Sequence, residues 1–435
     1  MIRIKPVRSL RGEVQIPGDK SISHRYAMLG AMAQGVTRID NFATSRDCQV
    51  TLNCVGALGV EVKQAQTTVE ISSHGWDNFV QPDRVLDAEN SGTTIRLLSS
   101  LLASREFTSS IQGDQSLNRR PMGRIINPLA LMGAEIEARE GRYPPLTIRG
   151  GRLQGIRYPL PVASAQVKSC VLLAGLTAQE RTTVVELTPS RDHTERALPF
   201  FGACLERRQH EDGGRCEISV GGQANLQATS MDIPGDFSSA VYFILGAVLA
   251  PGSEVVLRNV GVNPTRTGFL SLLEKAGADI AKSNCREVNG EPVCDLQIGS
   301  TDSVWERFPK EIKGSWIPNL IDEIPALAIL AIRLKHGLVV RDAEELRKKE
   351  SDRIQAVVSN LRQLGVEVEE LPDGFVVPPG QRVRGGKVET FGDHRIAMAF
   401  ALTALIAADP VELDEPECVD ISFPGFFDRF RSLCS

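Results

Sequence analysis

The stretch GDKSISHRYAMLGAMA, residues 18–33, sets the pattern of the whole chain: a short polar turn runs directly into a helix of small and apolar residues. Five further stretches repeat this pattern, and the starts lie about 70 to 90 residues apart. They are NSGTTIRLLSSLLA from Asn90, SAQVKSCVLLAGLTA from Ser164, GDFSSAVYFILGAVLA from Gly235, DEIPALAILAI from Asp322 and GDHRIAMAFALTALIA from Gly392. The sequence therefore predicts six repeated units.

Each of these helices runs into a strand-like segment, such as VTRIDN from Val36 and TTVVEL from Thr182. In five units a second helix follows about 40 residues on and ends at a glycine before another strand. The five glycines are Gly59, Gly133, Gly202, Gly277 and Gly365. Glycine is the usual residue just past a helix C-terminus, because it accepts the left-handed conformation without strain. The repeating order predicts an α/β protein with mixed sheets.

The six units divide into three plus three at a polar segment, residues 221–229. The sixth unit stops before its second helix and strand, so we expect the N-terminal strand to complete it. This predicts an N-terminal domain of residues 18–231 and a C-terminal domain of residues 1–17 plus 232–435. We expect the active site in the cleft between these two domains.

The composition is that of an ordinary globular protein, and the cations in its polar turns suggest a small anionic ligand. Of its 435 residues 42% are hydrophobic and 24% charged, with a net charge of −5. A net negative charge argues against a nucleic acid or a membrane surface as partner, because both require a basic face. Lysines and arginines nevertheless recur in the polar turns. Because a helix N-terminus also presents free N–H groups and partial positive charge, six such ends could converge on one anionic ligand.

Several classes of protein are excluded by what the sequence lacks. The longest apolar run, Ala240 to Ala250, has 11 residues and is too short to span a bilayer. The opening MIRIKPV has no signal-peptide core, so we expect a cytoplasmic protein. The nine cysteines show no CxxC spacing and the six histidines no HExxH. We therefore expect reduced thiols, no metal and no cofactor.

Seven segments, in order along nearly the full chain, resemble the 3-phosphoshikimate 1-carboxyvinyltransferase (EPSP synthase) family. They are GDKSISHR (18–25), NSGTTIRLL (90–98), GDQSLNRRPMGR (113–124), SAQVKS (164–169), SRDHTER (190–196), ELRKKESDRI (345–354) and GDHRIAMAF (392–400). The resemblance implies the enolpyruvyl transferase fold, an inside-out α/β barrel of two domains, each with three βαβαββ-type units. It also implies transfer of the enolpyruvyl group from phosphoenolpyruvate to the 5-hydroxyl of shikimate 3-phosphate, with release of phosphate, in the chorismate pathway to aromatic amino acids.

The family's substrate-binding residues match residues of this sequence. By resemblance, shikimate 3-phosphate would be bound by Lys20, Ser21, Arg25, Ser164, Gln166, Lys168, Ser190, Asp322 and Lys349. Phosphoenolpyruvate would be bound by Lys20, Gly92, Arg120, Gln166, Arg353 and Arg395. Arginine suits this task because its planar fork can grip an oxyanion with two parallel hydrogen bonds. Glycine at position 92 would let backbone N–H groups approach a ligand closely.

The reaction also needs groups that move protons. By resemblance, Asp322 is the principal proton acceptor, and Glu350 shares the proton transfers with Lys20. The structural alternative for Asp322 is an N-cap of the helix that starts at Ile324, and the adjacent Glu323 is a second candidate for the acceptor. We interpret the other polar residues of the turns as structural: His24 and His394 as hydrogen-bonding residues and the aspartates Asp19, Asp236 and Asp393 as partners of helix N-termini.

Two details place the chain within the family. The segments SAQVK (164–168), RPMGR (120–124) and NPTR (263–266) resemble the class II, glyphosate-tolerant subgroup. A C-terminal lysine of some members, which reaches phosphoenolpyruvate, is replaced here by Ile421. We expect a monomer whose partners are the two substrates, with glyphosate as a possible inhibitor.

Three alternative functions have identifiable signatures. A UDP-N-acetylglucosamine enolpyruvyl transferase would have an asparagine after Lys20 and a cysteine between Gly113 and Arg124, and this chain has neither. An RNA 3′-phosphate cyclase-like protein would have a basic surface. A catalytically inactive binding scaffold would be expected to lose Asp322, Glu350 or the arginines, all of which are present.

Overall fold

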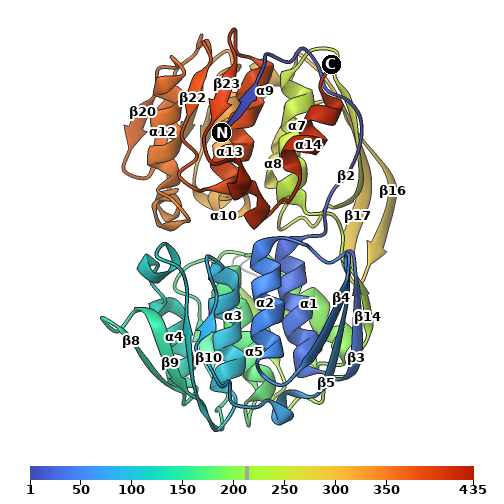
Figure 1. The fold of residues 1–435 in the computed structure, drawn as a ribbon, viewed down its shortest axis with the longest axis vertical. Helices are drawn as coiled ribbons and strands as arrows, with labels where there is room; N and C mark the ends of the chain where they lie inside the picture. Colours follow the sequence, from blue (N-terminus) through green and yellow to red (C-terminus); the bar gives the residue numbers. More distant parts are fainter. Residues whose placement is uncertain (211–214) are drawn as a thin grey trace. The chain divides into compact units, whose positions relative to one another are not determined.

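The computed structural model, which describes residues 1–210 and 215–435, divides into two compact units (Figure 1). Unit 1 comprises Met1–Pro17, Pro234–Glu287 and Pro292–Ser435. Unit 2 comprises Gly18–Ile233 and Val288–Glu291. The buried apolar side chains of the described residues form two separate clusters, one within each unit. Each unit is therefore described by itself below.

The strands in the described parts of the chain form six small mixed sheets, three in each unit. Those of unit 2 all follow one order. The sheets are β14 (Ser230–Asp232), β3 (Gln34–Asp40), β5 (Thr68–His74), β4 (Glu61–Ala65); β6 (Leu86–Asp87), β7 (Thr108–Gln112), β9 (Tyr143–Arg149), β8 (Glu135–Arg139); and β10 (Arg157–Pro159), β11 (Thr182–Glu186), β13 (Cys216–Val220), β12 (Leu205–Gln209). In each, the first two strands are parallel and the other neighbours antiparallel. The repeat in the sequence is thus a repeat of sheets.

Unit 1 builds the same kind of sheet with help from the start of the chain. Its sheets are β2 (Arg11–Gln15), β15 (Glu254–Gly261), β17 (Glu291–Gly299), β16 (Ile280–Val288); β18 (Glu311–Ile312), β19 (Leu338–Val340), β21 (Gly374–Val377), β20 (Glu369–Leu371); and β22 (Gly386–Val388), β23 (Val411–Leu413), β1 (Ile2–Ile4). Strand β22 runs parallel to β23, and β1 pairs with β23 antiparallel. In the sheet of the sixth repeat, β1 therefore occupies the third position, next to β23. In the other five repeats a strand of the repeat's own hairpin occupies this position.

The small-residue helices form the interior of each unit. They are α1 (Lys20–Met32), α3 (Gly92–Ala103), α5 (Ala165–Thr177), α7 (Phe237–Leu249), α11 (Ile324–Ala331) and α13 (His394–Ala401). Every residue of α7 is buried, as is all of α5 from Val167 onward, and helices apolar all round belong in a core. In unit 2, Figure 1 shows α1, α2 (Arg46–Gly56), α3 and α5 side by side, with β3, β4 and β5 on one flank and β8 and β9 on another. The predicted inside-out α/β architecture is confirmed.

The polar turns start these helices as the sequence predicted. The side chains of Asp19, Ser91, Ser164, Asp236 and Asp393 each accept a hydrogen bond from a backbone N–H in the first turn. The structural interpretation of the three aspartates is thereby confirmed. Helix α11 begins after Glu323, whose side chain makes no such hydrogen bond. Asp322 is therefore not the N-cap of this helix, and its carboxylate makes other contacts.

The second helices end at the predicted glycines. They are α2, α4 (Gly123–Leu131), the short α6 (His193–Ala197) with its 3₁₀ extension η3 (Leu198–Phe201), α8 (Gly268–Lys275) and α12 (Arg353–Gln363). The five glycines that follow them have backbone φ angles between 79° and 108°, the left-handed region that other residues avoid. Five of the predicted boundaries are therefore correct to within a few residues.

One expectation about the cysteines is wrong. Cys285 in β16 and Cys294 in β17 form a disulfide, whereas we expected reduced thiols throughout; the other seven cysteines are free. The two strands are joined by Asn289 and Gly290, both with positive φ, a two-residue turn that places these cysteines opposite each other. The Asn-Gly pair is a sequence signal for this turn and its register, which the sequence analysis left out. The remaining elements of unit 1 are α9 (Val304–Arg307), α10 (Ile317–Leu320), η4 (Gly314–Trp316), η5 (Glu344–Lys348), η6 (Leu402–Leu405), η7 (Pro416–Ile421) and α14 (Phe426–Leu433), and unit 2 adds η1 (Trp76–Asn78) and η2 (Leu117–Arg119).

Candidate active site

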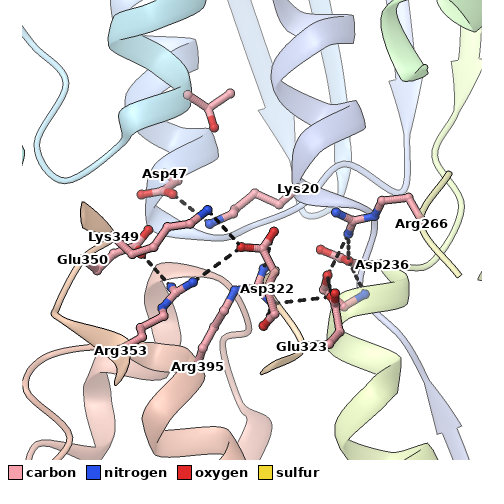
Figure 2. A network of polar contacts seen from close by, with 12 residues as sticks. Lys20, Asp47, Asp236, Arg266, Asp322, Glu323, Lys349, Glu350, Arg353 and Arg395 are labelled. Atoms are coloured by element: carbon pink, nitrogen blue, oxygen red, sulfur yellow. Dashed lines mark hydrogen bonds and ion pairs between the residues drawn. The ribbon is translucent and has the colours of Figure 1, made fainter. Parts of the chain in front are cut away.

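In unit 2 the first two turns of α1 carry Lys20, Ser21 and Arg25. The Nζ of Lys20 lies 2.9 Å from Oδ2 of Asp47, in the first turn of α2 (Figure 2). Arg25 is buried and donates from Nε to Oγ1 of Thr194 at 2.8 Å and from Nη2 to Oγ of Ser169 at 2.9 Å. It also donates to the carbonyl of Ser21 at 2.8 Å. Arg25 therefore ties α1 to α5 and α6.

The second group of unit 2 gathers at the N-terminus of α3. Gln166 accepts from Nη1 of Arg96 at 3.1 Å and donates to Oγ1 of Thr93 at 3.0 Å. A Cβ atom added to Gly92 would lie 2.6 Å from Nη1 of Arg96 and 3.1 Å from Nη2 of Arg120. Glycine at this position lets two guanidinium groups approach the start of a helix. The structure thus brings Gly92, Arg120 and Gln166 together, and adds Arg96, which the sequence analysis left out.

The third group of unit 2 lies at the start of α5. Ser164 caps the helix, and Ser190 lies in the loop between β11 and α6. Lys168 is enclosed: its side chain is 1% exposed, and its Nζ lies 2.6 Å from Glu195 and 3.0 Å from Glu186. The resemblance assigned this lysine to the substrate; in the structure its ammonium group faces two buried carboxylates.

In unit 1, cations surround Asp322 (Figure 2). Its Oδ1 lies 3.3 Å from Nζ of Lys349 and 3.4 Å from Nη1 of Arg353, and its Oδ2 lies 3.8 Å from Nη2 of Arg395. Arg395 also donates to the Asp322 carbonyl at 3.2 Å. The side chain of Asp322 is nevertheless 11% exposed, so the carboxylate keeps a path to a ligand.

Arg353 is the centre of this group. It is almost fully buried, and it lies 2.6 Å from Glu350 through Nη2 and 2.8 Å from Asp393 through Nε. Burial would lower the pKa of Arg353, but the carboxylates of Asp393 and Glu350 raise it above its ordinary value. Burial likewise opposes the charge on Asp393, and the Arg353 guanidinium overcomes it, so the pKa of Asp393 is lowered. We call Asp322, Lys349, Glu350, Arg353, Asp393 and Arg395 the Asp322 cluster.

Glu323, the alternative to Asp322, also lies near Arg395, with its Oε1 3.9 Å from Nη1 of that arginine, but its hydrogen bond is made to another group of side chains. Its Oε1 accepts a hydrogen bond from Ser238, whose hydroxyl oxygen accepts from Nη2 of Arg266 at 2.9 Å. Arg266 in turn lies 3.0 Å from Asp236, the cap of α7. Figure 2 shows the Glu323 side chain directed toward this pair and the Asp322 side chain toward Lys349 and Arg353. The two adjacent carboxylates therefore share Arg395 as a neighbour and differ in their other partners.

Of the two motif histidines, His24 makes the hydrogen bond expected of a structural group. His24 is fully buried, with Nδ1 2.6 Å from the hydroxyl of Thr51. Burial, and then the charges of Lys20 and Arg25, lower its pKa well below the ordinary value, so the ring is neutral.

In residues 1–210 and 215–435, no three His, Cys, Asp or Glu side chains are grouped so as to hold a metal ion. Across the same residues, no helix is both long enough and apolar enough to cross a membrane.

These features define a class of protein: an α/β transferase with lysines, arginines and carboxylates at the N-termini of buried helices, suited to small substrates with several negative charges. Comparison with known proteins gives the family. The profile of the family "EPSP synthase (3-phosphoshikimate 1-carboxyvinyltransferase)" matches residues 4–430.

Relatives and solved structures agree with that match. The 3-phosphoshikimate 1-carboxyvinyltransferase of Thermoanaerobacter sp. (strain X514) is 44% identical over 432 residues, 99% of this chain and 100% of the relative. That of Solibacter usitatus is 47% identical over 431 residues, 99% of both chains. The structure of EPSP synthase from Acinetobacter baumannii superposes with a TM-score of 0.85 at 39% identity, covering 99% of this chain and 98% of the other.

The chain therefore belongs to the EPSP synthase family. Its function is that of the family: transfer of the enolpyruvyl group from phosphoenolpyruvate to shikimate 3-phosphate in the shikimate pathway of aromatic amino acid biosynthesis.

Proposed function

We propose that the polar turns divide this transfer into substrate binding, carried mainly by unit 2, and proton movement, carried mainly by the Asp322 cluster of unit 1. The single observation that carries the proposal is the setting of Asp322. It is a carboxylate beside three cations, is not used as a helix cap and is still partly accessible.

Shikimate 3-phosphate is bound, in this proposal, by residues at the N-termini of α1 and α5 together with the β11–α6 loop. They are Lys20, Ser21, Arg25, Ser164, Gln166 and Ser190, with Asp322 and Lys349 from unit 1. Several of these side chains sit beside backbone N–H groups of a helix start, where a phosphate or carboxylate is stabilised. Arg25 supports the assignment because three hydrogen bonds fix its guanidinium before any ligand arrives.

Phosphoenolpyruvate is bound by Lys20, Gly92, Arg120, Gln166, Arg353 and Arg395. The support for Gly92 is steric, since any larger residue would meet the guanidinium groups of Arg96 and Arg120. The support for Arg353 and Arg395 is that both are buried and held in place by carboxylates, so that little conformational entropy is lost on binding.

The proton chemistry follows from the carboxylates. Asp322 accepts the proton of the 5-hydroxyl group of shikimate 3-phosphate while the oxygen of that hydroxyl forms a bond to C2 of phosphoenolpyruvate. Glu350 or Lys20 adds a proton at C3. A tetrahedral intermediate results. When the C2–phosphate oxygen bond breaks and phosphate leaves, a C3 proton returns to the enzyme and the enolpyruvyl double bond is restored. General acid–base groups of this kind contribute about 10²- to 10⁴-fold.

We propose that the enzyme is a cytoplasmic monomer. We also propose that it belongs to the class II, glyphosate-tolerant subgroup, on the basis of SAQVK, RPMGR and NPTR in the sequence. Ile421, at the end of η7, cannot supply the cation that some members place there, which removes one contact to an anionic inhibitor. Inhibition of phosphate release by glyphosate and the mass in solution by light scattering test these two points.

Phosphate release from phosphoenolpyruvate tests the function itself. The enzyme is offered shikimate 3-phosphate and, separately, UDP-N-acetylglucosamine. We expect release with shikimate 3-phosphate alone. Phosphate release with the nucleotide sugar alone would mean that shikimate 3-phosphate is not the acceptor. No release with either acceptor would favour the catalytically inactive scaffold.

A further inference from the structure

A buried ionic cluster lies under the proposed shikimate 3-phosphate residues of unit 2. Lys168 projects from α5, Glu186 is the last residue of β11, and Glu195 lies in α6. Their side chains are 1%, 4% and 7% exposed. We call these three residues the Lys168 cluster. Its lysine is not in contact with solvent, which makes it a poor ligand for an incoming phosphate.

The Lys168 cluster holds Ser190 at three points. Oε1 of Glu186 accepts from the backbone N–H of Ser190 at 3.2 Å and from its hydroxyl. Nζ of Lys168, which lies 3.0 Å from the other oxygen of Glu186, donates to the Ser190 carbonyl at 3.3 Å. The donors and the carbonyl acceptor of this residue are thus bonded to two side chains. These hydrogen bonds from Lys168 and Glu186 therefore fix the position of Ser190 in its loop.

The same cluster also supports Arg25. Glu195 pairs with Lys168, and the preceding residue, Thr194, lies 2.6 Å from Ser169, the residue after Lys168. Thr194 and Ser169 are the two hydroxyls to which Arg25 donates. One ion pair and one hydroxyl pair thus join α6 to α5, and this junction seats both Arg25 and the loop that carries Ser190.

The energetics favour a positioning role over a purely stabilising one. Taking charges out of water costs several kcal/mol for each ion, and burial raises the pKa of Glu195 above its ordinary value even beside Lys168. Replacing such a cluster with apolar residues is often neutral for stability. Burial alone would lower the pKa of Lys168, but Glu195 and Glu186 raise it above its ordinary value, so the ammonium stays charged and does not exchange protons with a substrate. What the charges supply is a fixed geometry for Ser190.

We propose that Lys168 is a positioning residue for shikimate 3-phosphate, acting with Glu186 and Glu195 through Ser190 and not by contact with the phosphate. This inference rests on the proposed assignment of Ser190 to that substrate. Because the Ser190 hydroxyl donates to Glu186, its oxygen is left to accept a hydrogen bond. The cluster therefore presents Ser190 to a hydroxyl group of the substrate.

A double-mutant cycle between Glu186 and Ser190 tests the proposal, with the KM of each substrate and kcat as readouts. In Glu186→Gln only one side-chain oxygen remains, so the glutamine can accept hydrogen bonds from Ser190 or from Lys168 but not from both. We expect the KM for shikimate 3-phosphate to rise about 5- to 10-fold, with kcat and the KM for phosphoenolpyruvate within about twofold, as a loss of uniform binding requires. In a Ser190→Ala background, Glu186→Gln should add less than about twofold.

Controls separate positioning from general loosening of the fold. Val171→Ala removes a fully buried side chain from the same helix, so it should lower the melting temperature without changing either KM. Because Lys168→Met would strand two buried carboxylates, it is combined with Glu195→Gln, and we expect the same selective rise in KM in that pair.

Each contrary result has its own meaning. If the Glu186 and Ser190 effects multiply, or if the KM for shikimate 3-phosphate does not change in Glu186→Gln, the positioning role is wrong. If the Lys168→Met, Glu195→Gln pair raises that KM equally with and without Ser190, Lys168 does not act through Ser190 and the proposal is wrong. A wild-type KM in Ser190→Ala removes the assignment of Ser190 and the inference with it. None of these outcomes affects the proposed function, which fails only if the wild-type enzyme releases no phosphate with shikimate 3-phosphate.

Discussion

The helix starts of unit 2 and the Asp322 cluster of unit 1 use the same kind of turn for different purposes. In unit 2, Arg25 and Arg96 donate to hydroxyls, a carbonyl and an amide oxygen. In unit 1, Arg353 lies against the carboxylates of Asp393, Glu350 and Asp322. Hydroxyl, carbonyl and amide partners orient a guanidinium group, whereas carboxylates also oppose its charge and add groups that can carry protons. The comparison teaches that the same kind of turn can fix an arginine with neutral hydrogen-bond acceptors or with carboxylates. The second arrangement places candidate proton carriers beside Arg353 and Arg395, which we propose bind phosphoenolpyruvate.

The largest expected effect on stability is in the Asp322 cluster. Arg353→Met removes a buried guanidinium and leaves Asp393, Glu350 and Asp322 without their shared partner. We expect the free energy of unfolding to fall by about 3–5 kcal/mol, measured by chemical denaturation. Lys349→Met is the matched control, because Lys349 contacts the same Asp322 oxygen but is 25% exposed, and a partly exposed pair is worth about 1 kcal/mol or less. Equal losses in the two variants would contradict the idea that burial distinguishes Arg353.

A smaller effect, which depends on pH, is expected at Asp393. Asp393→Asn keeps the helix cap but removes the charge that faces Arg353, and hydrogen bonds to charged groups contribute about 1.5–3 kcal/mol. Because the pKa of Asp393 is lowered in the folded protein, the unfolded chain binds more protons, and this group stabilises the fold fully above its unfolded pKa of about 3.9. The stability gap between wild type and variant should therefore be largest near neutrality and shrink as the pH falls below about 4.

Denaturation curves of the wild type and Asp393→Asn at a series of pH values measure that gap directly. A gap that stays constant down to pH values well below 3.9 would show that the Asp393 charge does not contribute in the way described.

The binding region is tested by a change that leaves charge untouched. In Gly92→Ala the new methyl group would displace the guanidinium groups of Arg96 and Arg120. We expect the KM for phosphoenolpyruvate to rise about tenfold, equivalent to about 1.4 kcal/mol, with a smaller change for shikimate 3-phosphate. Gly56→Ala, at a helical glycine with open space around it, is the matched control and should leave both constants unchanged. A phosphoenolpyruvate KM that stays at the wild-type value would remove the steric argument for Gly92.

The sequence predicted what is local. The polar turns, the small-residue helices and the five terminal glycines follow from residue chemistry within one turn of a helix, so their positions could be read directly. The caps at Asp19, Asp236 and Asp393 were predicted for the same reason.

What the sequence could not predict depends on contacts between distant segments. The second role of Asp393, as a partner of Arg353 40 positions away, arises only when α12 and α13 pack together. The enclosure of Lys168 needs β11 and α6, and the Cys285–Cys294 pair needs the register of a hairpin. The sequence signal for Arg96 is its place one turn after Gly92 on the same helix face.

The central claim is that Asp322, and not its neighbour Glu323, accepts the proton during the transfer. The most direct test is single-turnover phosphate release at saturating shikimate 3-phosphate and phosphoenolpyruvate in Asp322→Asn and Glu323→Gln, with shikimate 3-phosphate binding measured by calorimetry. The account predicts a rate at least about 10²-fold slower in Asp322→Asn with binding largely retained, and a rate within about tenfold of the wild type in Glu323→Gln. A near-normal rate in Asp322→Asn, or an equal loss in Glu323→Gln, would contradict it.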